Sequence, residues 1–237
     1  PNPFLGWRAI RMCLDESEIF KTQLRALLRA AMHGDVRIML PLVVTLDEVT
    51  QARALLDAGA AELRARGTAH KSDVPLGVMI ETPAAAVGAD FLARDVAFFS
   101  IGTNDLVQYT LAVDRGNANL ASRFTPLHPA VLRLVRRTVE VGAEHGLEVS
   151  VCGEMASQPL MAFALIGLGL RSLSVAPRAV PLMKRLVRSL RAADARVAAE
   201  AALEAGTAAR AEALLREALT SAVQDRQLLE DGLLGLG

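Results

Sequence analysis

Three short apolar segments of this chain each lead into a polar group that stands close to the start of a helix. The segments are residues 76–80, 97–101 and 148–151, and the polar groups after them are Glu81, Asn104 with Asp105, and Cys152. Short, nearly continuous apolar runs predict strands of a parallel sheet that is covered on both faces. Because parallel strands end at one edge of their sheet, we expect these polar side chains to lie on that edge.

Helix signals fill the intervals between the apolar segments. Pro83, Pro129 and Pro159 each stand where a first helical turn should begin, and Thr45 with Glu48 has the pattern of a capping box. Two more apolar segments, residues 36–40 and 173–175, bring the predicted strands to about five. The alternation of strand and helix predicts an α/β fold with right-handed crossovers.

A closed parallel barrel of this kind has eight strands. We therefore expect a (β/α)8 TIM-type barrel that is incomplete at its N-terminus, with its first strands upstream of Pro1. Residues 1–190 should form this barrel domain. Residues 191–237, which are rich in Ala, Arg and Glu, should form C-terminal helices interrupted at Gly206 and Thr207, followed by a frayed tail from Asp231 on.

Two finer predictions concern the first long helix. Asp15 and Glu18 resemble a capping pair at its start, and Gly34 is placed to close it in the left-handed conformation. Its apolar stripe should face the core and consists of Ile19, Phe20, Leu24, Leu27 and Leu28.

Composition excludes several classes of function. Lys and Arg together number 26, as do Asp and Glu, so there is no net charge to favour nucleic acid or an anionic membrane as a partner. No apolar segment reaches the roughly 18 residues of a spanning helix. The two cysteines, Cys13 and Cys152, form no disulfide framework of the secreted type, which indicates a cytoplasmic location.

Glu81 and Asp105 are the candidate metal ligands. Each carboxylate alone is better explained as a helix cap, but two at equivalent strand ends favour a shared hard cation. Mg²⁺ prefers one or two carboxylates, with water and substrate oxygens as its other ligands.

Arg8 and Arg115 are the candidate anion-binding residues, because each lies next to a glycine turn and a guanidinium contacts phosphate or carboxylate with two donors. Cys152 at a strand end is a candidate proton donor or nucleophile, although a buried structural role is common for cysteine. Cys13 lacks such a context and is interpreted as structural.

Five motifs of the chain are together highly specific. They cover residues 2–8, 77–83, 98–105, 108–117 and 152–154. With these motifs in this order, the chain resembles the C-terminal, phosphoenolpyruvate-binding domain of Enzyme I of the bacterial sugar phosphotransferase system, a member of the phosphoenolpyruvate/pyruvate superfamily. The resemblance extends over residues 2–190 and more loosely over the C-terminal helices.

The resemblance implies a role for each candidate residue. Glu81 and Asp105 match the Mg²⁺ ligands of the family, and Arg8 and Arg115 match its phosphate-binding arginines. Asn104 matches an amide that contacts the substrate. Cys152 matches the acid that protonates the enolate carbon. The implied enzyme is a phosphoenolpyruvate-protein phosphotransferase, which moves phosphoryl from phosphoenolpyruvate to an active-site histidine, releases pyruvate, and then phosphorylates the carrier protein HPr for sugar uptake.

The same resemblance implies that part of the machinery is missing. The phosphohistidine of the family belongs to a separate N-terminal domain, and two further substrate-binding arginines come from the first barrel strands. We therefore expect this chain alone to bind the substrate weakly and to be unable to phosphorylate itself. A homodimer is the implied assembly.

Several alternatives stay open at this point. A nitrogen-system paralogue or a fused multi-phosphoryl transfer protein would retain this domain, and pyruvate phosphate dikinase and phosphoenolpyruvate synthase share similar motifs. A Mg²⁺-dependent pyruvate aldolase would also use Glu and Asp at neighbouring strand ends. A non-catalytic module for dimerisation or ligand sensing is the third kind of alternative.

Overall fold

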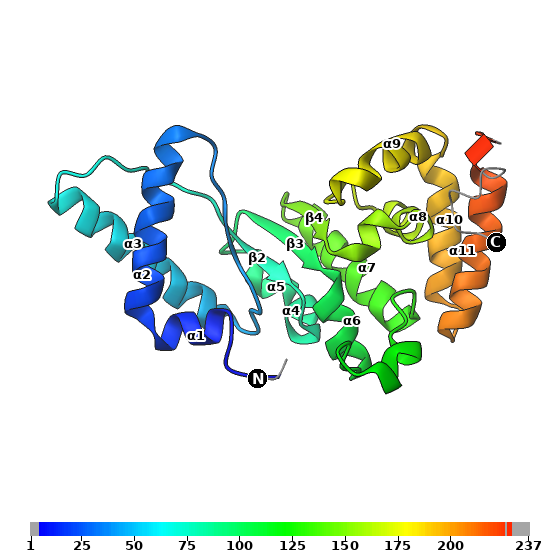
Figure 1. Cartoon of the computed structure of the whole chain (residues 1–237), viewed down its shortest axis with the longest axis horizontal. Helices are drawn as coiled ribbons and strands as arrows, with labels where there is room; N and C mark the ends of the chain where they lie inside the picture. Colours follow the sequence, from blue (N-terminus) through cyan, green and yellow to red (C-terminus); the bar gives the residue numbers. More distant parts are fainter. Residues whose placement is uncertain (1–4, 226, 229–237) are drawn as a thin grey trace. The chain divides into compact units, whose positions relative to one another are not determined.

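The structure is a computed structural model, and it describes residues 5–225 and 227–228. The chain divides into two compact units (Figure 1). Unit 1 comprises the described residues up to Ser100 together with Val141–Glu148, and unit 2 comprises Ile101–Glu140 and the described residues from Val149 on. Three elements contribute residues to both units: β3 (Phe98–Gly102), α7 (Pro129–Glu144) and β4 (Glu148–Cys152).

Unit 1 contains two long helices that pack against each other and the first two strands of the sheet. Its helices are α1 (Ile10–Asp15), α2 (Ser17–Ala30), the short 3-10 helix η1 (Ala31–His33), α3 (Leu46–Ala65), α4 (Pro83–Val87) and α5 (Ala89–Leu92). Its own strands are β1 (Ile38–Leu40) and β2 (Leu76–Ile80). Helices α2 and α3 lie side by side (Figure 1), and α2 buries Phe20, Leu24 and Leu28, whereas Ile19 of the predicted stripe is exposed.

The strands β2 and β3 are closely packed at Gly77 and Phe98. β1 and β2 are parallel, with Ile38 opposite Leu76. A Cβ placed on Gly77 would come within 2.5 Å of the Phe98 ring. Glycine at this position of β2 therefore leaves the space that the aromatic side chain fills.

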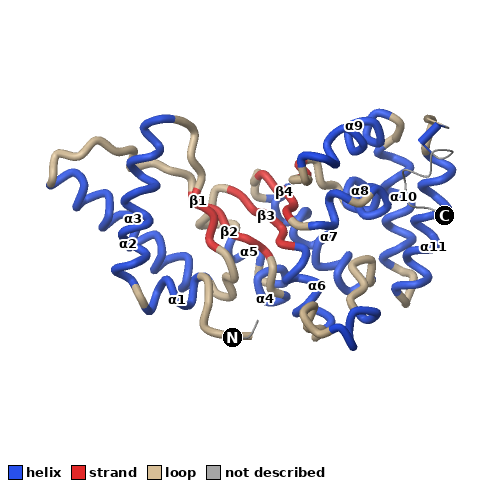
Figure 2. Tube along the Cα trace, in the orientation of Figure 1, coloured by secondary structure: helices blue, strands red, loops and turns tan. Residues whose placement is uncertain are grey.

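Unit 2 is mostly helical, as the blue segments of Figure 2 show. Its helices, in addition to most of α7, are α6 (Thr103–Leu111), η2 (Ala118–Arg123), η3 (Glu154–Ser157), α8 (Pro159–Gly167), η4 (Pro177–Ala179), α9 (Val180–Arg188), α10 (Ala192–Leu203) and α11 (Ala208–Ala222). Its own strand is β5 (Ser172–Leu173), which pairs in parallel with β4.

Small residues allow the helices of unit 2 to approach closely. α10 packs on α8 and on α11, and Ala195, Ala199 and Ala202 of α10 are buried. At the end of α8, Gly167 faces the carbonyl group of Ala195 so closely that a Cβ would have no room. The helix pair α8 and α10 therefore depends on the absence of a side chain at this position.

The described residues contain one five-stranded sheet in the order β1-β2-β3-β4-β5. The number of strands matches the prediction from the sequence, and both assigned strand pairs are parallel. The predicted helix starts at Pro83, Pro129 and Pro159 are confirmed. None of the helices in the described part of the chain has the length and apolar character needed to span a membrane.

Two predictions about the first long helix are wrong. Asp15 is the last residue of α1 and accepts a hydrogen bond from the indole of Trp7 at 2.7 Å, so it does not cap α2, which starts at Ser17. Gly34 has an extended backbone with φ of 174° and does not close the helix in the left-handed conformation. In contrast, the capping box of Thr45 and Glu48 is present. The predicted tail from Asp231 on lies outside the described residues.

Candidate functional site

Glu81 directly follows β2 in unit 1 and is 6% exposed. The backbone N–H of Leu42 donates to its Oε1 at 2.7 Å. Thr82 beside it caps α4 by accepting from the N–H of Ala85 and donates its own hydroxyl to the carbonyl of Val43 at 3.0 Å. These contacts hold the buried carboxylate in a fixed orientation, and they assign the capping role to Thr82, leaving Glu81 for other contacts.

Arg8 lies in unit 1, in the segment that precedes α1, and its side chain is half-buried. The neighbouring Arg11 donates to the carbonyl of Gly6 at 3.2 Å, so this segment folds back on the start of α1. The described part of the predicted motif at residues 2–8 thus forms a turn, as the sequence indicated, while its first three residues lie outside the described part.

Asn104 and Asp105 belong to the first turn of α6 in unit 2. Asp105 is predicted at a strand end, but β3 ends at Gly102 and the helix begins at the next residue. Asp105 is 7% exposed. A carboxylate in a first helical turn interacts favourably with the helix dipole.

Arg115 approaches Asp105 from the turn that follows α6. Its Nη2 lies 3.5 Å from Asp105 Oδ1, and about a third of the arginine side chain is exposed. The turn is closed by Asp114, whose Oδ1 accepts from the N–H of Gly116 at 2.7 Å. The predicted turn therefore presents a guanidinium beside a buried carboxylate, with solvent access for an anionic ligand.

Cys152 is the last residue of β4, as predicted, and it is half-buried and free. Its thiol donates to the carbonyl of Ile101 at 3.5 Å, and the hydroxyl of Thr103 donates to its carbonyl at 3.2 Å. Gly153 follows with φ of 113°, and a Cβ there would collide with the hydroxyl of Thr103 and lie 3.4 Å from Asn104 Oδ1. The ends of β3 and β4 are thereby joined around the thiol.

The structure brings four of the six predicted site residues together within unit 2. Asp105 and Arg115 are in contact, and Asn104 and Cys152 meet through Thr103 and Gly153. Glu81 and Arg8 belong to unit 1.

The predicted metal ligands Glu81 and Asp105 are not part of a larger cluster of metal-binding side chains in the described residues. No cluster of three or more His, Cys, Asp or Glu side chains in this part of the chain could hold a metal ion. Two buried carboxylates, Glu81 and Asp105, nevertheless fit the donor chemistry of Mg²⁺, which takes few protein ligands and completes its shell with water and substrate oxygens.

Two supporting residues were missed by sequence reasoning. Thr103 donates to the backbone of Cys152, and Gln108 accepts from the backbone N–H of Arg115 at 3.0 Å. The only signal in the sequence is their position in α6, where Gln108 lies one helical turn after Asp105.

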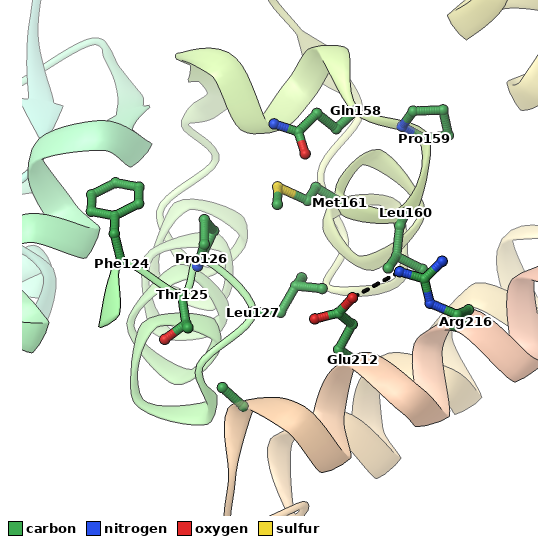
Figure 3. Close-up of a pocket in the computed structure, with 11 residues that line it drawn as sticks. Phe124, Thr125, Pro126, Leu127, Gln158, Pro159, Leu160, Met161, Glu212 and Arg216 are labelled. Carbon is green, nitrogen blue, oxygen red and sulfur yellow. Dashed lines mark hydrogen bonds and ion pairs between the residues drawn. The ribbon is translucent and has the colours of Figure 1, made fainter. Parts of the chain in front are cut away.

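A cavity of about 370 Å³ lies elsewhere in unit 2, between the segment 124–127, the start of α8 and α11 (Figure 3). It is lined largely by apolar side chains such as Leu127 and Met161. At its edge, Arg216 Nη2 and Glu212 Oε1 form an ion pair along α11 at 2.8 Å. None of the predicted site residues lines it.

Comparison with known proteins identifies the family. The sequence family described as "PEP-utilising enzyme, PEP-binding domain", in which PEP stands for phosphoenolpyruvate, matches residues 1–192. The chain belongs to the PEP-utilising enzymes. The match ends at the first residue of α10, so it covers all five strands and every predicted site residue of this PEP-utilising family member.

Curated relatives confirm the resemblance to Enzyme I. A phosphoenolpyruvate-protein phosphotransferase of Haemophilus influenzae is 44% identical over 92% of this chain and 38% of its own length. Proteins of the same name from Staphylococcus carnosus and Priestia megaterium are 44% and 45% identical over 87% and 81% of this chain. This chain spans less than two fifths of the length of these relatives.

A solved structure supports the fold class. The crystal structure of a citrate lyase from Burkholderia xenovorans LB400 matches 86% of this chain and 70% of that chain, with a TM-score of 0.52 and 21% identity. The likeness in fold confirms the predicted α/β class with parallel strands.

Proposed function

We propose that this chain is the phosphoenolpyruvate-binding part of a phosphoenolpyruvate-protein phosphotransferase. The observation that carries the proposal is the contact between Asp105 and Arg115 at 3.5 Å, next to Asn104 and in a chain 44% identical to a protein of that name. The buried carboxylate of Asp105 can bind a cation, and the part-exposed guanidinium of Arg115 can bind a phosphate beside it.

In this proposal the basic residues bind and orient the substrate. Arg115 and Arg8 contact the phosphate oxygens and offset their charge, and the amide of Asn104 contacts the substrate. Glu81 and Asp105 would hold Mg²⁺. When bound, the cation neutralises charge on the transferring group. The catalysis is therefore mainly positioning with electrostatic stabilisation.

Cys152 completes the reaction as the proton donor. The P–O bond of the substrate breaks as a P–N bond forms to the acceptor histidine, which leaves the enolate of pyruvate. The thiol of Cys152 gives its proton to the methylene carbon of that enolate, and pyruvate is released. The thiol donates a hydrogen bond to the carbonyl of Ile101 at 3.5 Å, and this contact orients its sulfur.

The remaining parts of the proposal concern the whole enzyme. The acceptor histidine lies in a separate N-terminal domain, and the phosphoryl group passes from it to HPr during sugar uptake. The enzyme is a cytoplasmic homodimer. Residues 1–190 form the substrate-binding domain and the C-terminal helices follow it. The relatives favour this function over the aldolase and sensing alternatives.

Isothermal titration of the chain with phosphoenolpyruvate tests the proposal. We expect binding that requires Mg²⁺, because both carboxylates would otherwise repel the anionic substrate. Asp105→Asn should weaken binding at least tenfold, which corresponds to about 1.4 kcal/mol. Arg133→Ala is the matched control, because Arg133 is exposed and contacts only Leu203 and Glu204 among the described interactions. Binding that is equal with and without Mg²⁺ would contradict the assigned ligands.

A further inference from the structure

Gln108 is almost completely buried, with 3% of the residue exposed, and it makes two contacts with the turn after α6. Its backbone carbonyl accepts from the N–H of Val113 at 3.0 Å, and its side-chain Oε1 accepts from the N–H of Arg115 at 3.0 Å. One residue therefore holds both ends of the short segment that carries the arginine.

The turn from Ala112 to Gly116, which includes both contacts, needs such support. Ala112 ends α6 in the left-handed conformation with φ of 53°, which is unfavourable for a residue with a Cβ. Beyond it, the side chain of Asp114 closes the turn onto the N–H of Gly116. A strained residue persists where the surrounding contacts determine it, and Gln108 supplies two of them.

We propose that Gln108 is a positioning residue for phosphate binding. Its side chain fixes the backbone of Arg115 while Asp105, one turn earlier on α6, lies 3.5 Å from the guanidinium. The arginine is thus held at both ends before a ligand arrives, which lowers the cost of ordering it on binding. This inference rests on the proposed function, because it assumes that Arg115 binds the phosphate group.

The buried amide of Gln108 has two opposite effects on stability. Because Oε1 accepts from an N–H group, the orientation of the amide is determined. Nε2 is then a buried donor with no hydrogen-bond partner among the described residues. An unpaired buried donor costs free energy, and an apolar side chain of similar size removes that cost, but it also leaves the N–H of Arg115 without its acceptor.

The experiment compares Gln108→Met with Thr110→Val in the complete chain. Methionine matches glutamine in length but accepts no hydrogen bond from Arg115. Thr110 lies on the same helix, and its Oγ1 is likewise buried without a hydrogen-bond partner in the described structure. Thr110→Val therefore removes a buried polar atom without touching the turn.

Three readouts distinguish positioning from a structural role. Amide hydrogen exchange at Arg115 should become faster in Gln108→Met only. Affinity for phosphoenolpyruvate with Mg²⁺ should fall about five- to tenfold, in line with the loss of one hydrogen bond. Affinity for oxalate with Mg²⁺, a dicarboxylate without phosphate, should fall less than twofold. The urea midpoint of Thr110→Val should stay at or above that of the unsubstituted chain, and the midpoint of Gln108→Met should stay close to it, because its two effects on stability offset each other.

Each contrary result has a distinct meaning. Unchanged exchange at Arg115, or unchanged affinity for phosphoenolpyruvate in Gln108→Met, would overturn the inference while the proposed function stands. An equal loss for phosphoenolpyruvate and oxalate would overturn it too, since the effect would not be specific to phosphate. If Gln108→Met is poorly folded, Gln108→Asn, which is one methylene too short to reach Arg115, provides the same comparison. Failure of the unsubstituted chain to bind phosphoenolpyruvate would overturn the proposed function itself, and Arg115 exchange would still decide whether Gln108 anchors the turn.

Discussion

The structure tolerates replacement of Gly153 poorly. Its φ of 113° and ψ of 177° belong to a region that essentially only glycine adopts. The space that a Cβ would occupy is already filled by the hydroxyl of Thr103. Two independent obstacles, one of conformation and one of space, therefore act at the residue next to Cys152.

We expect Gly153→Ala to destabilise the chain by about 2–5 kcal/mol, from backbone strain and overpacking together. Gly146→Ala is the matched control. Gly146 also has positive φ, 67°, but no atom lies within 4 Å of the added methyl group, so its cost should be about 1–2 kcal/mol. Urea unfolding measures both.

A double variant distinguishes backbone strain from overpacking at position 153. Thr103→Ala removes the hydroxyl that collides with the new methyl group, so in the Gly153→Ala background it should restore part of the lost stability. Equal destabilisation by Gly153→Ala and Gly146→Ala would show that the space around Gly153 adapts and that strain alone matters.

At the scale of residues, the sequence predicted where the candidate residues lie but not the contacts that support them. Cys152 at a strand end and Arg115 in a turn were predicted from their neighbours, because glycine and strand patterns are local signals. Thr103 contacts the backbone of Cys152, and Gln108 contacts the backbone of Arg115. These contacts depend on how the chain folds back on itself, which no local sequence pattern indicates. Asp105 was predicted at the end of a strand, but it lies in the first turn of α6, because this helix starts at the residue after β3.

At the scale of elements, α9 is tied to the segment after α11 by a bidentate ion pair. Arg185 Nε lies 2.6 Å from Asp225 Oδ2, and Arg185 Nη2 lies 2.9 Å from Asp225 Oδ1. The hydrogen bond from Arg185 is the main cause that lowers the pKa of Asp225 below its ordinary value. The geometry with two parallel bonds is the favourable one for arginine and carboxylate.

This ion pair should make part of the stability dependent on pH. Because the pKa of Asp225 is lower in the folded state, the stabilisation is complete above the unfolded value of about 3.9 and is lost as the pH falls through the folded value. The difference in urea midpoint between the unsubstituted chain and Asp225→Asn should therefore shrink between pH 6 and pH 3. A difference that is constant over this range would exclude the carboxylate as its source.

Element types were easier to predict than element ends. Proline at a first helical turn marked the starts of α4, α7 and α8 correctly, because it fixes φ and lacks only a donor that the helix does not use. The predicted strand at residues 36–40 proved to cover only Ile38–Leu40. Asp15 does not cap a helix, because its carboxylate accepts a hydrogen bond from the indole N–H of Trp7, eight residues earlier.

At the scale of the whole molecule, the division into two units cuts through secondary structure. Strands β3 and β4 and helix α7 each give residues to both units. A strand is held by hydrogen bonds along its whole length, so loss of one unit would remove part of a strand that the other needs. We therefore expect the units to unfold in a single cooperative transition.

The two cysteines report on this transition separately, because Cys13 lies in unit 1 and Cys152 in unit 2. Single-cysteine variants, Cys13→Ser and Cys152→Ser, each leave one thiol to react with a labelling reagent in a urea series. Burial raises the pKa of Cys13, so it should react slowly until its unit opens. The two labelling midpoints should coincide, and separate midpoints would show that the units unfold independently.

The predicted boundary near residue 190 rests on composition and on the resemblance, and it remains a proposal. Composition changes where Ala-rich helices begin, but it does not reveal which helices pack on which strands. That depends on contacts such as Gly167 against α10, where the deciding feature is the lack of a side chain.

The close approach of Gly77 and Phe98 has an evolutionary consequence. The aromatic ring of Phe98 occupies the volume that any side chain at position 77 would require, so large side chains cannot be present at both positions. Neither can be exchanged freely on its own: a bulkier residue at 77 is compatible only with a slimmer partner at 98. Across related sequences, these two columns should therefore vary in step, with opposite changes in size.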